Sequence, residues 1–417
     1  MRSDRFPSVE ERVKLYMSNF YIPPCNATDD ASGQSVDERL RYSYSFNSSS
    51  ETYPEVEISG YSDHRSIVRL DTRIKPDVPI ALWEDALEPC YFPGFEKGYC
   101  PDARKIATMA KALTGKHTLG ELPPIIAEFG DHHEAQLRKE IVPYIKKFRD
   151  AASAGALEKV TNRKSGLDCK TFAGRQKLLP LSHESDSDAG DRLFFSPIVW
   201  LLNYKRHYGY VAEVKWTDSP WELKKDMAIW RGLLTGFLSL EDREEKSFKE
   251  LCDMLSRCRF VRDNLDTPGL DVGVSEQLSD FLVDNDNLNM IKGRKLRITH
   301  LHYKVIIIME GNDVSSGLKW ALYSRSVVMM PTPTKTSFLM EELLSPWIHY
   351  VPLKSDLSDV REKLEWVSKH DEAARKIAER GTLFIHDLLY HEDSELENRQ
   401  IQEEILHRYM KFFVEED

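Results

Sequence analysis

The carboxyl-terminal half of the chain alternates between short apolar runs and amphipathic segments. Residues 304–309 read Lys-Val-Ile-Ile-Ile-Met, a β-branched run typical of a strand buried on both faces. A polar turn at 310–316 and a short helix at 317–323 follow it. The same pattern predicts strands at 326–330 and 348–351, and helices at 338–344, 357–368, 371–389 and 395–412. Strands that alternate with helices at this spacing indicate a parallel sheet with crossover helices, and hence an α/β fold.

The amino-terminal half is patterned less regularly. Helices are predicted at 9–17 and 101–113, and residues 124–129 form an apolar run that predicts a buried strand ending at Gly130-Asp131. Further along, residues 227–230 resemble a strand and residues 241–258 an amphipathic helix. Because open α/β sheets place their functional groups at the carboxyl ends of strands, Asp131 is a candidate site residue.

Composition narrows the class of protein. The chain has 417 residues, 41% hydrophobic and 30% charged, with a net charge of −11, which argues against nucleic acid as a main partner. It holds no apolar run of about 18 residues, so no membrane-spanning segment is predicted. The first ten residues lack the apolar core of a signal peptide. Two N-glycosylation sequons, at Asn26 and Asn47, favour a secretory lumen (endoplasmic reticulum or Golgi) only weakly, and a cytoplasmic location stays open.

Six cysteines lie at positions 25, 90, 100, 169, 252 and 258. None has the spacing of a zinc site, so no zinc is predicted. Buried thiols and two or three disulfides are both compatible with this number.

Several ordered motifs carry a resemblance to a known family. They are Tyr-Lys at 303–304, Glu-Gly-Asn-Asp-Val-Ser-Ser-Gly-Leu-Lys-Trp at 310–320, Ser-Val-Val at 326–328, Pro-Trp-Ile-His-Tyr-Val-Pro-Leu at 346–353, Asp-Leu at 356–357 and Ile-Ala-Glu-Arg-Gly at 377–381. Upstream, Trp230-Arg231-Gly232 is followed by Thr235-Gly236. These motifs resemble glycosyltransferase family 90, which includes protein O-glucosyltransferases and capsule xylosyltransferases.

The resemblance implies a GT-B fold, in which two Rossmann-like domains face each other across a cleft. The implied parts are a partly irregular extension at 1–100, an acceptor-side domain at 101–222, a nucleotide-sugar domain at 223–390, and a last helix at 391–417 that is expected to cross back. It also implies an inverting transfer of glucose or xylose from a UDP-sugar to a glycan or glycoprotein acceptor, with no cofactor and no obligatory metal. The alternative is a non-catalytic, glycan-binding member of the same fold.

One departure limits what is carried over. The animal glucosyltransferases carry an arginine where this chain has Gly317. The sequence of the turn resembles that of bacterial and algal members instead. The donor sugar and acceptor of the animal enzymes are therefore not assigned to this chain.

The turn after the strand at 304–309 is the first candidate for nucleotide-sugar binding. Backbone N–H groups and the N-terminal dipole of the next helix can hold a diphosphate there, and hydroxyls or a lysine can add donors. The residues expected to do so are Gly311, Asn312, Asp313, Ser315, Ser316, Gly317 and Lys319. The alternative is an ordinary, well-capped strand–helix turn.

A second group lies around the strand at 227–230. Arg231 is suited to a diphosphate because its guanidinium donates two parallel hydrogen bonds, although a salt bridge is the alternative. Trp230, Gly232 and Thr235 belong to the same element, and a core position suits Trp230 better than a stack on uracil. Arg262 is a second candidate cation.

Two carboxylates complete the predicted site. Glu341 is expected to bind ribose hydroxyls, with a first-turn glutamate favoured by the helix dipole as the alternative. Asp131 is the candidate general base, because an inverting transfer needs a carboxylate to take the acceptor's proton, unless it only caps the following segment. Asp284-Asn285-Asp286, His132-His133 and His300-x-His302 could suggest metal, but no convincing ligand set emerges and none is predicted.

Overall fold

The computed structural model describes residues 6–17, 69–71, 100–117, 125–128, 145–151, 197–235, 246–275 and 288–412. The chain divides into two compact units. One comprises Met1–Phe6 and Tyr204–Ser394, and the other Pro7–Asn203 and Glu395–Asp417. Each unit is considered by itself below.

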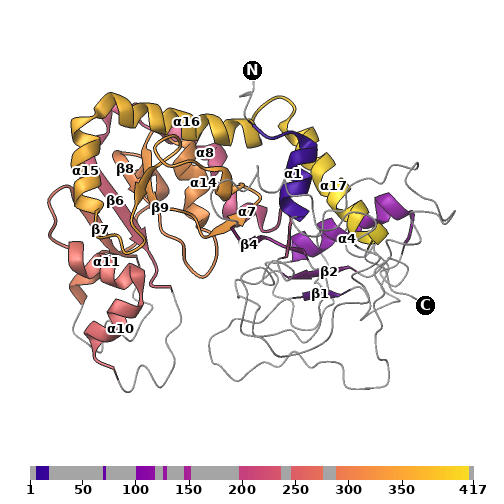
Figure 1. The fold of residues 1–417 in the computed structure, drawn as a ribbon, viewed down its shortest axis with the longest axis horizontal. Helices are drawn as coiled ribbons and strands as arrows, with labels where there is room; N and C mark the ends of the chain where they lie inside the picture. Colours follow the sequence, from indigo (N-terminus) through magenta and orange to yellow (C-terminus); the bar gives the residue numbers. More distant parts are fainter. Residues whose placement is uncertain are drawn as a thin grey trace, which may run out of the picture. The chain divides into compact units, whose positions relative to one another are not determined.

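A parallel sheet of five strands forms the core of the first unit, in the order β11-β9-β8-β6-β7 (Figure 1). Its central strand β8 is almost fully buried at Val305, Ile306 and Ile307. Apolar side chains on both faces explain why helices must cover both. The predicted α/β fold with a parallel sheet is therefore confirmed. The strands of this unit are β6 (Lys225–Gly232), β7 (Leu270–Val274), β8 (Tyr303–Ile307), β9 (Val327–Pro331), β10 (Lys335–Ser337) and β11 (Val351–Leu353).

Helices pack against these strands: α11 on β7, α14 and α16 on β9, and α15 on β6 and β11 (Figure 1). The helix predictions for 317–323, 357–368 and 371–389 are confirmed within three residues. The helices of this unit are α7 (Tyr204–His207), α8 (Val211–Thr217), η5 (Trp221–Leu223), α10 (Phe248–Met254), α11 (Ser256–Asn264), η6 (Leu288–Met290), α13 (Arg297–His300), α14 (Ser316–Tyr323), η7 (Glu341–Leu343), α15 (Val360–Lys369) and α16 (Asp371–Leu389).

The helix predicted at 241–258 is not continuous. Ser247 and Glu250 form a capping box that starts α10, and Leu255 adopts an extended conformation that ends it. A second helix, α11, then begins at Ser256. Cys252 and Cys258 are joined by a disulfide across the break, which settles the open choice between thiol and disulfide for this pair.

Two further predictions were wrong in their bounds. Only the 3-10 turn η7 forms where a helix was expected at 338–344, because Met340 takes a left-handed conformation with φ of 63°. The strand expected at 348–351 begins at Val351. Before it, the N–H of Trp347 donates to the carbonyl of Tyr350 at 2.7 Å, which closes a tight turn that pattern alone does not reveal.

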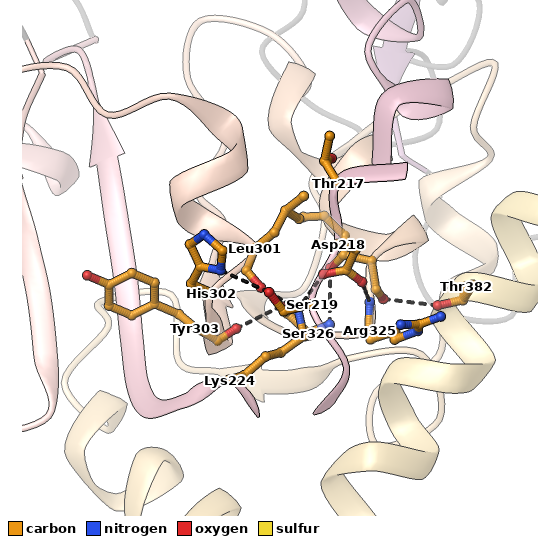
Figure 2. Close-up of polar contacts among 12 residues, drawn as sticks. Thr217, Asp218, Ser219, Lys224, Leu301, His302, Tyr303, Arg325, Ser326 and Thr382 are labelled. Atoms are coloured by element: carbon orange, nitrogen blue, oxygen red, sulfur yellow. Dashed lines mark hydrogen bonds and ion pairs between the residues drawn. The ribbon is translucent and has the colours of Figure 1, made fainter. Parts of the chain in front are cut away.

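Polar contacts join the segments at the amino edge of the five-stranded sheet, where its parallel strands begin (Figure 2). Lys224, just before β6, is buried and donates to Asp218 and to the carbonyl of Leu301. Asp218 accepts in turn from the backbone N–H of Arg325, just before β9. Ser326 Oγ donates to the carbonyl of Tyr303 at 2.7 Å. These bonds tie together the segments that enter three neighbouring strands.

The second unit is built around a sheet in the order β1-β2-β3-β5, in which β1 is antiparallel and the others are parallel. On α17, Glu397 and Asn398 bind the buried Arg12 of α1, and the carbonyl of Gln402 accepts from the indole of Trp200. The helix predictions for 9–17, 101–113 and 395–412 are confirmed. The elements are α1 (Val9–Met17), β1 (Arg69–Asp71), α4 (Cys100–Thr114), β2 (Ile126–Glu128), β3 (Ile145–Lys146), β4 (Phe148–Asp150), β5 (Ile198–Val199) and α17 (Ser394–Phe412). Within the ranges described, no helix combines the length and apolar character needed to cross a bilayer.

Candidate functional site

The glycine turn between β8 and α14 is packed tightly against two other segments. A β-carbon on Gly311 would lie 2.9 Å from Oγ1 of Thr235 and 3.0 Å from Nη2 of Arg257. Contacts that short would force a neighbour to move, so only glycine fits here without a shift. The structure therefore brings together the turn, the segment after β6 and the start of α11, at the edge where β6 and β8 end.

Arg257 is the cation at this edge. Its two terminal nitrogens donate to the carbonyls of Leu233 and Met309, at 3.0 and 2.8 Å. These acceptors are neutral, and no carboxylate lies within ion-pair distance of the guanidinium in the part of the chain that is described. Burial lowers the pKa of Arg257 to about 10, against the opposing pull of Asp313. The side chain is thus still charged at neutral pH, and a half-buried charge of this kind favours an anionic ligand.

Two hydroxyl groups lie at the same edge. Oγ1 of Thr235 is buried and has no hydrogen-bond partner among the described residues. Ser315 is the N-cap of α14, yet its side chain makes no capping bond. Buried hydroxyls normally find a partner, so Thr235 is a donor that a ligand can satisfy. Ser316 follows as the first residue of α14, and the first N–H groups of a helix have no partner four residues earlier within the helix.

Lys319 and Glu341 form a buried ion pair with 2.8 Å between Nζ and Oε1 and side chains at most 2% exposed. Glu341 also accepts from the backbone N–H and the hydroxyl of Ser337. Sequence reasoning assigned Lys319 to the diphosphate and Glu341 to ribose. In the structure these two residues pair with each other, so their ion pair links α14 to η7.

The side chain of Arg231 binds a residue of the neighbouring strand, β7. Its Nη2 pairs with Asp271 on β7, and its Nη1 donates to the carbonyls of Trp230 and Asp271. Asp271 also accepts from Lys295 and Tyr303. Burial alone would raise the pKa of Asp271, but the hydrogen bonds from these three donors lower it well below its usual value. The salt bridge that the sequence left as an alternative is present.

The other predicted residues are placed as follows. Trp230 is buried in the core against Phe260, and a β-carbon on Gly232 would lie 2.7 Å from its ring. Arg262 pairs with Asp253 and Asp263 on the outer side of α11. Within the turn, Asn312 is half-buried and Asp313 is buried, 4.0 Å from Nε2 of His207. Gly317 has room, because a β-carbon there would meet Ile308 at an ordinary 3.4 Å.

Some predictions lie outside the described residues. They concern Asp131, the pair His132-His133, and Asp284 with Asp286. Of the histidines that could suggest metal, Nδ1 of His300 bonds the carbonyl of Leu296 and Nδ1 of His302 bonds Ser219.

Sequence reasoning missed Arg257. The segment holds three arginines, at 257, 259 and 262. The predicted continuous helix through Leu255 gives no reason to assign the first of them to the site. The break at Leu255 sets the direction of α11, which brings Arg257 rather than Arg262 to the glycine turn. A signal was present in the neighbouring Cys258, whose disulfide to Cys252 fixes that break.

Comparisons with known proteins give these residues a family. The sequence model described as "Glycosyl transferase family 90" matches residues 202–413, half of the chain. O-glucosyltransferase LpsA of Dichelobacter nodosus is 28% identical over 158 residues, which is 38% of this chain and 42% of that protein. Protein O-glucosyltransferase 2 of Danio rerio is 40% identical over 168 residues, 40% of this chain and 30% of that protein. Human protein O-glucosyltransferase 1 is 34% identical over 115 residues, 28% of each.

The chain spans less than half the length of these curated relatives. The family match begins just before α7 and ends just after α17, so it contains the five-stranded sheet, the glycine turn and Arg257. On this match, the chain belongs to glycosyl transferase family 90.

Proposed function

We propose that this chain is an inverting glycosyltransferase that moves a sugar, glucose or xylose, from a UDP-sugar to a hydroxyl group of a glycan or protein. The family match and the names of the related O-glucosyltransferases support glycosyl transfer. One structural observation carries the donor part of the proposal. Arg257 is a half-buried cation at the edge where β6 and β8 end, and among the described residues no carboxylate forms an ion pair with it.

A diphosphate suits that position for physical reasons. As the bond from sugar to diphosphate breaks, negative charge grows on the leaving group, and a preorganised cation and N–H donors stabilise it. Arg257 supplies the charge, Thr235 a buried hydroxyl, and the N-terminus of α14 the N–H groups of Ser316 and Gly317. Glycine at 311 allows the turn to approach both side chains. The donor site in this proposal needs no metal ion, because the cation is part of the protein.

The GT-B arrangement belongs to the same proposal. In this proposal the nucleotide-sugar domain, predicted at 223–390, is the unit that holds the parallel sheet, Tyr204–Ser394, and the acceptor-side domain, predicted at 101–222, is the unit that contains Pro7–Asn203. The helix at 391–417 would then cross back to the acceptor-side domain. Parallel sheets with crossover helices bind ligands at the carboxyl ends of their strands, which agrees with the position of the glycine turn.

Asp131 is the proposed general base. The acceptor oxygen attacks the anomeric carbon, the bond from that carbon to UDP breaks, and the acceptor's proton moves to the carboxylate. Asp131→Asn keeps the shape of the side chain and removes the proton acceptor, so turnover is expected to fall about 10²–10⁴-fold, the usual worth of a general base. UDP affinity should stay within about twofold, because the donor contacts lie elsewhere; a normal turnover would remove Asp131 from the mechanism.

A donor screen tests the proposed function. The full chain is incubated with UDP-glucose, UDP-xylose and UDP-galactose, with and without EDTA, and UDP release is measured. We expect release from glucose or xylose donors that survives EDTA. Binding of UDP without turnover of any donor, with glycan binding retained, would favour a non-catalytic member of the fold. Loss of activity in EDTA and recovery with Mn²⁺ would return Asp284 and Asp286 to the site.

A further inference from the structure

A cavity of about 410 Å³ lies beside the turn that precedes β11. Its lining residues come from that turn, from α15 and from α16: Trp347, Trp366, Ala373, Lys376, Ile377 and Arg380. Figure 1 shows α15 and α16 meeting at one corner of the sheet. Trp347 precedes β11 in the chain, whereas the glycine turn follows β8. Because these strands are parallel through β9, the cavity and the proposed donor site lie at opposite edges of the sheet.

Two tryptophans form the aromatic wall of the cavity. The rings of Trp347 and Trp366 meet edge to face, with centroids 4.7 Å apart, and Trp366 stacks on His370 at 4.8 Å. Trp347 is 40% exposed and has a φ of 63°, a left-handed conformation that a bulky residue rarely adopts. A large, partly exposed ring on a residue with this backbone conformation costs conformational free energy. Residues strained in this way cluster at functional sites.

Two cations stand one helical turn apart on the α16 side. Lys376 pairs with Glu372 at 2.7 Å, but both side chains are exposed, so that pair is weak and can exchange for a ligand. Arg380 makes no hydrogen bond or ion pair with the residues the structure describes. The next acid along the helix, Glu379, is engaged by Arg375 instead. The cavity therefore offers positive charge on a chain whose net charge is −11.

We propose that this cavity binds an acidic saccharide, with a sugar ring against the tryptophans and a carboxylate or sulfate group on Arg380 and Lys376. The C–H face of a sugar ring packs on an aromatic face, and its hydroxyls tolerate an open, wet cavity. The guanidinium fork of Arg380 matches a planar carboxylate. The volume lies within the range of small-ligand sites. This site is separate from the donor site and needs no turnover, so it stands or falls independently of the proposed function.

Binding to the full chain tests the proposal. Tetragalacturonate and a heparin-derived tetrasaccharide are titrated by calorimetry and by quenching of tryptophan fluorescence. Maltotetraose serves as the neutral saccharide, and a glutamate-rich peptide as the acidic non-saccharide. We expect at least one acidic tetrasaccharide to bind, maltotetraose to bind at least about tenfold more weakly, and the peptide not to bind.

Variants place the ligand. Arg380→Ala and Trp366→Leu should each weaken the acidic saccharide about tenfold or more, the worth of a charge-assisted contact or a stacked ring. Arg399→Ala, which removes an exposed arginine of α17 paired to Glu403, is the control and should change nothing. UDP should neither compete nor bind differently to Arg380→Ala. The proposal is overturned if neither acidic saccharide binds at millimolar concentration, if maltotetraose or the peptide binds as tightly, or if Arg399→Ala weakens binding as much as Arg380→Ala.

Discussion

Nη2 of Arg257 lies so close to Gly311 that a β-carbon on the glycine would be 3.0 Å from it. The two residues belong to segments 54 positions apart in the chain, and their contact joins the start of α11 to the turn after β8. Because of this contact, Arg257 and Gly311 belong to one candidate anion site.

Gly311→Ala tests how much the site depends on that approach. The added methyl group would press on Thr235 and Arg257, so we expect UDP affinity to fall about tenfold while the fold persists. Gly317→Ala, in the same turn, is the matched control, because its methyl group would meet Ile308 at 3.4 Å and should leave the affinity unchanged. Calorimetric titration with UDP measures both. Equal affinities in the two variants would show that the space at Gly311 is not part of the site.

Lys224→Met tests the polar network at the amino edge of the sheet (Figure 2). The substitution leaves the carboxylate of Asp218 without its buried cation, and breaking a buried pair in this way costs about 3–5 kcal/mol. Lys225→Met is the neighbouring control. Its side chain is exposed, so we expect a change within about 0.5 kcal/mol. Urea unfolding curves compare them. A Lys224→Met protein as stable as the wild type would mean that the network does not hold the edge.

His349 is expected to make the protein less stable in mild acid. Burial, helped by the charge of Arg380, lowers the pKa of His349 to about 4, and Nδ1 accepts the N–H of Ser345 at 2.9 Å. Histidine in the unfolded chain has a pKa of about 6.5. Between about pH 4 and 6.5 the unfolded chain therefore binds a proton at this residue and the folded chain does not. The free energy of unfolding should therefore decrease as the pH falls through this window.

An NMR titration of the His349 ring measures the same effect directly. In Arg380→Ala the pKa should rise, yet stay below 6.5, because burial is the larger cause and is unchanged. A wild-type pKa at or above 6.5 would contradict the buried, neutral state of this histidine.

Much of the fold could be predicted from the sequence where burial sets the pattern. The run at 304–309 gave β8, and the long amphipathic helices α15, α16 and α17 were placed within three residues because their apolar positions recur along one face. The misplaced bounds share a different cause. Leu255, Met340 and Trp347 each take a conformation imposed by local tertiary contacts, and two of them have a positive φ that side-chain type does not announce.

The site could be predicted in part, because position along a strand is visible in a sequence and side-chain partners are not. The glycine turn and Thr235 were found from their places after strands, and the structure brings Gly311 and Thr235 together. Arg231 and Lys319 occupy the expected positions, but their charges are neutralised by Asp271 and Glu341. Neither acid is near its partner in sequence, so the pairing depends on the fold. Arg257 was missed for the reverse reason, since only the fold shows that none of the described carboxylates forms an ion pair with it.

UDP affinity of Arg257→Ala, measured by calorimetry beside wild type and Arg262→Ala, tests whether the donor site lies at this edge of the sheet. Both arginines are half-buried residues of α11, but Arg262 is paired to Asp253 and Asp263. A charge-assisted contact to the diphosphate is worth about 1.5–3 kcal/mol, so Arg257→Ala should bind UDP about 10- to 100-fold more weakly, and Arg262→Ala as tightly as wild type. Unchanged UDP affinity in a folded Arg257→Ala protein, or an equal loss in Arg262→Ala, would contradict the assignment of the donor site to this edge of the sheet.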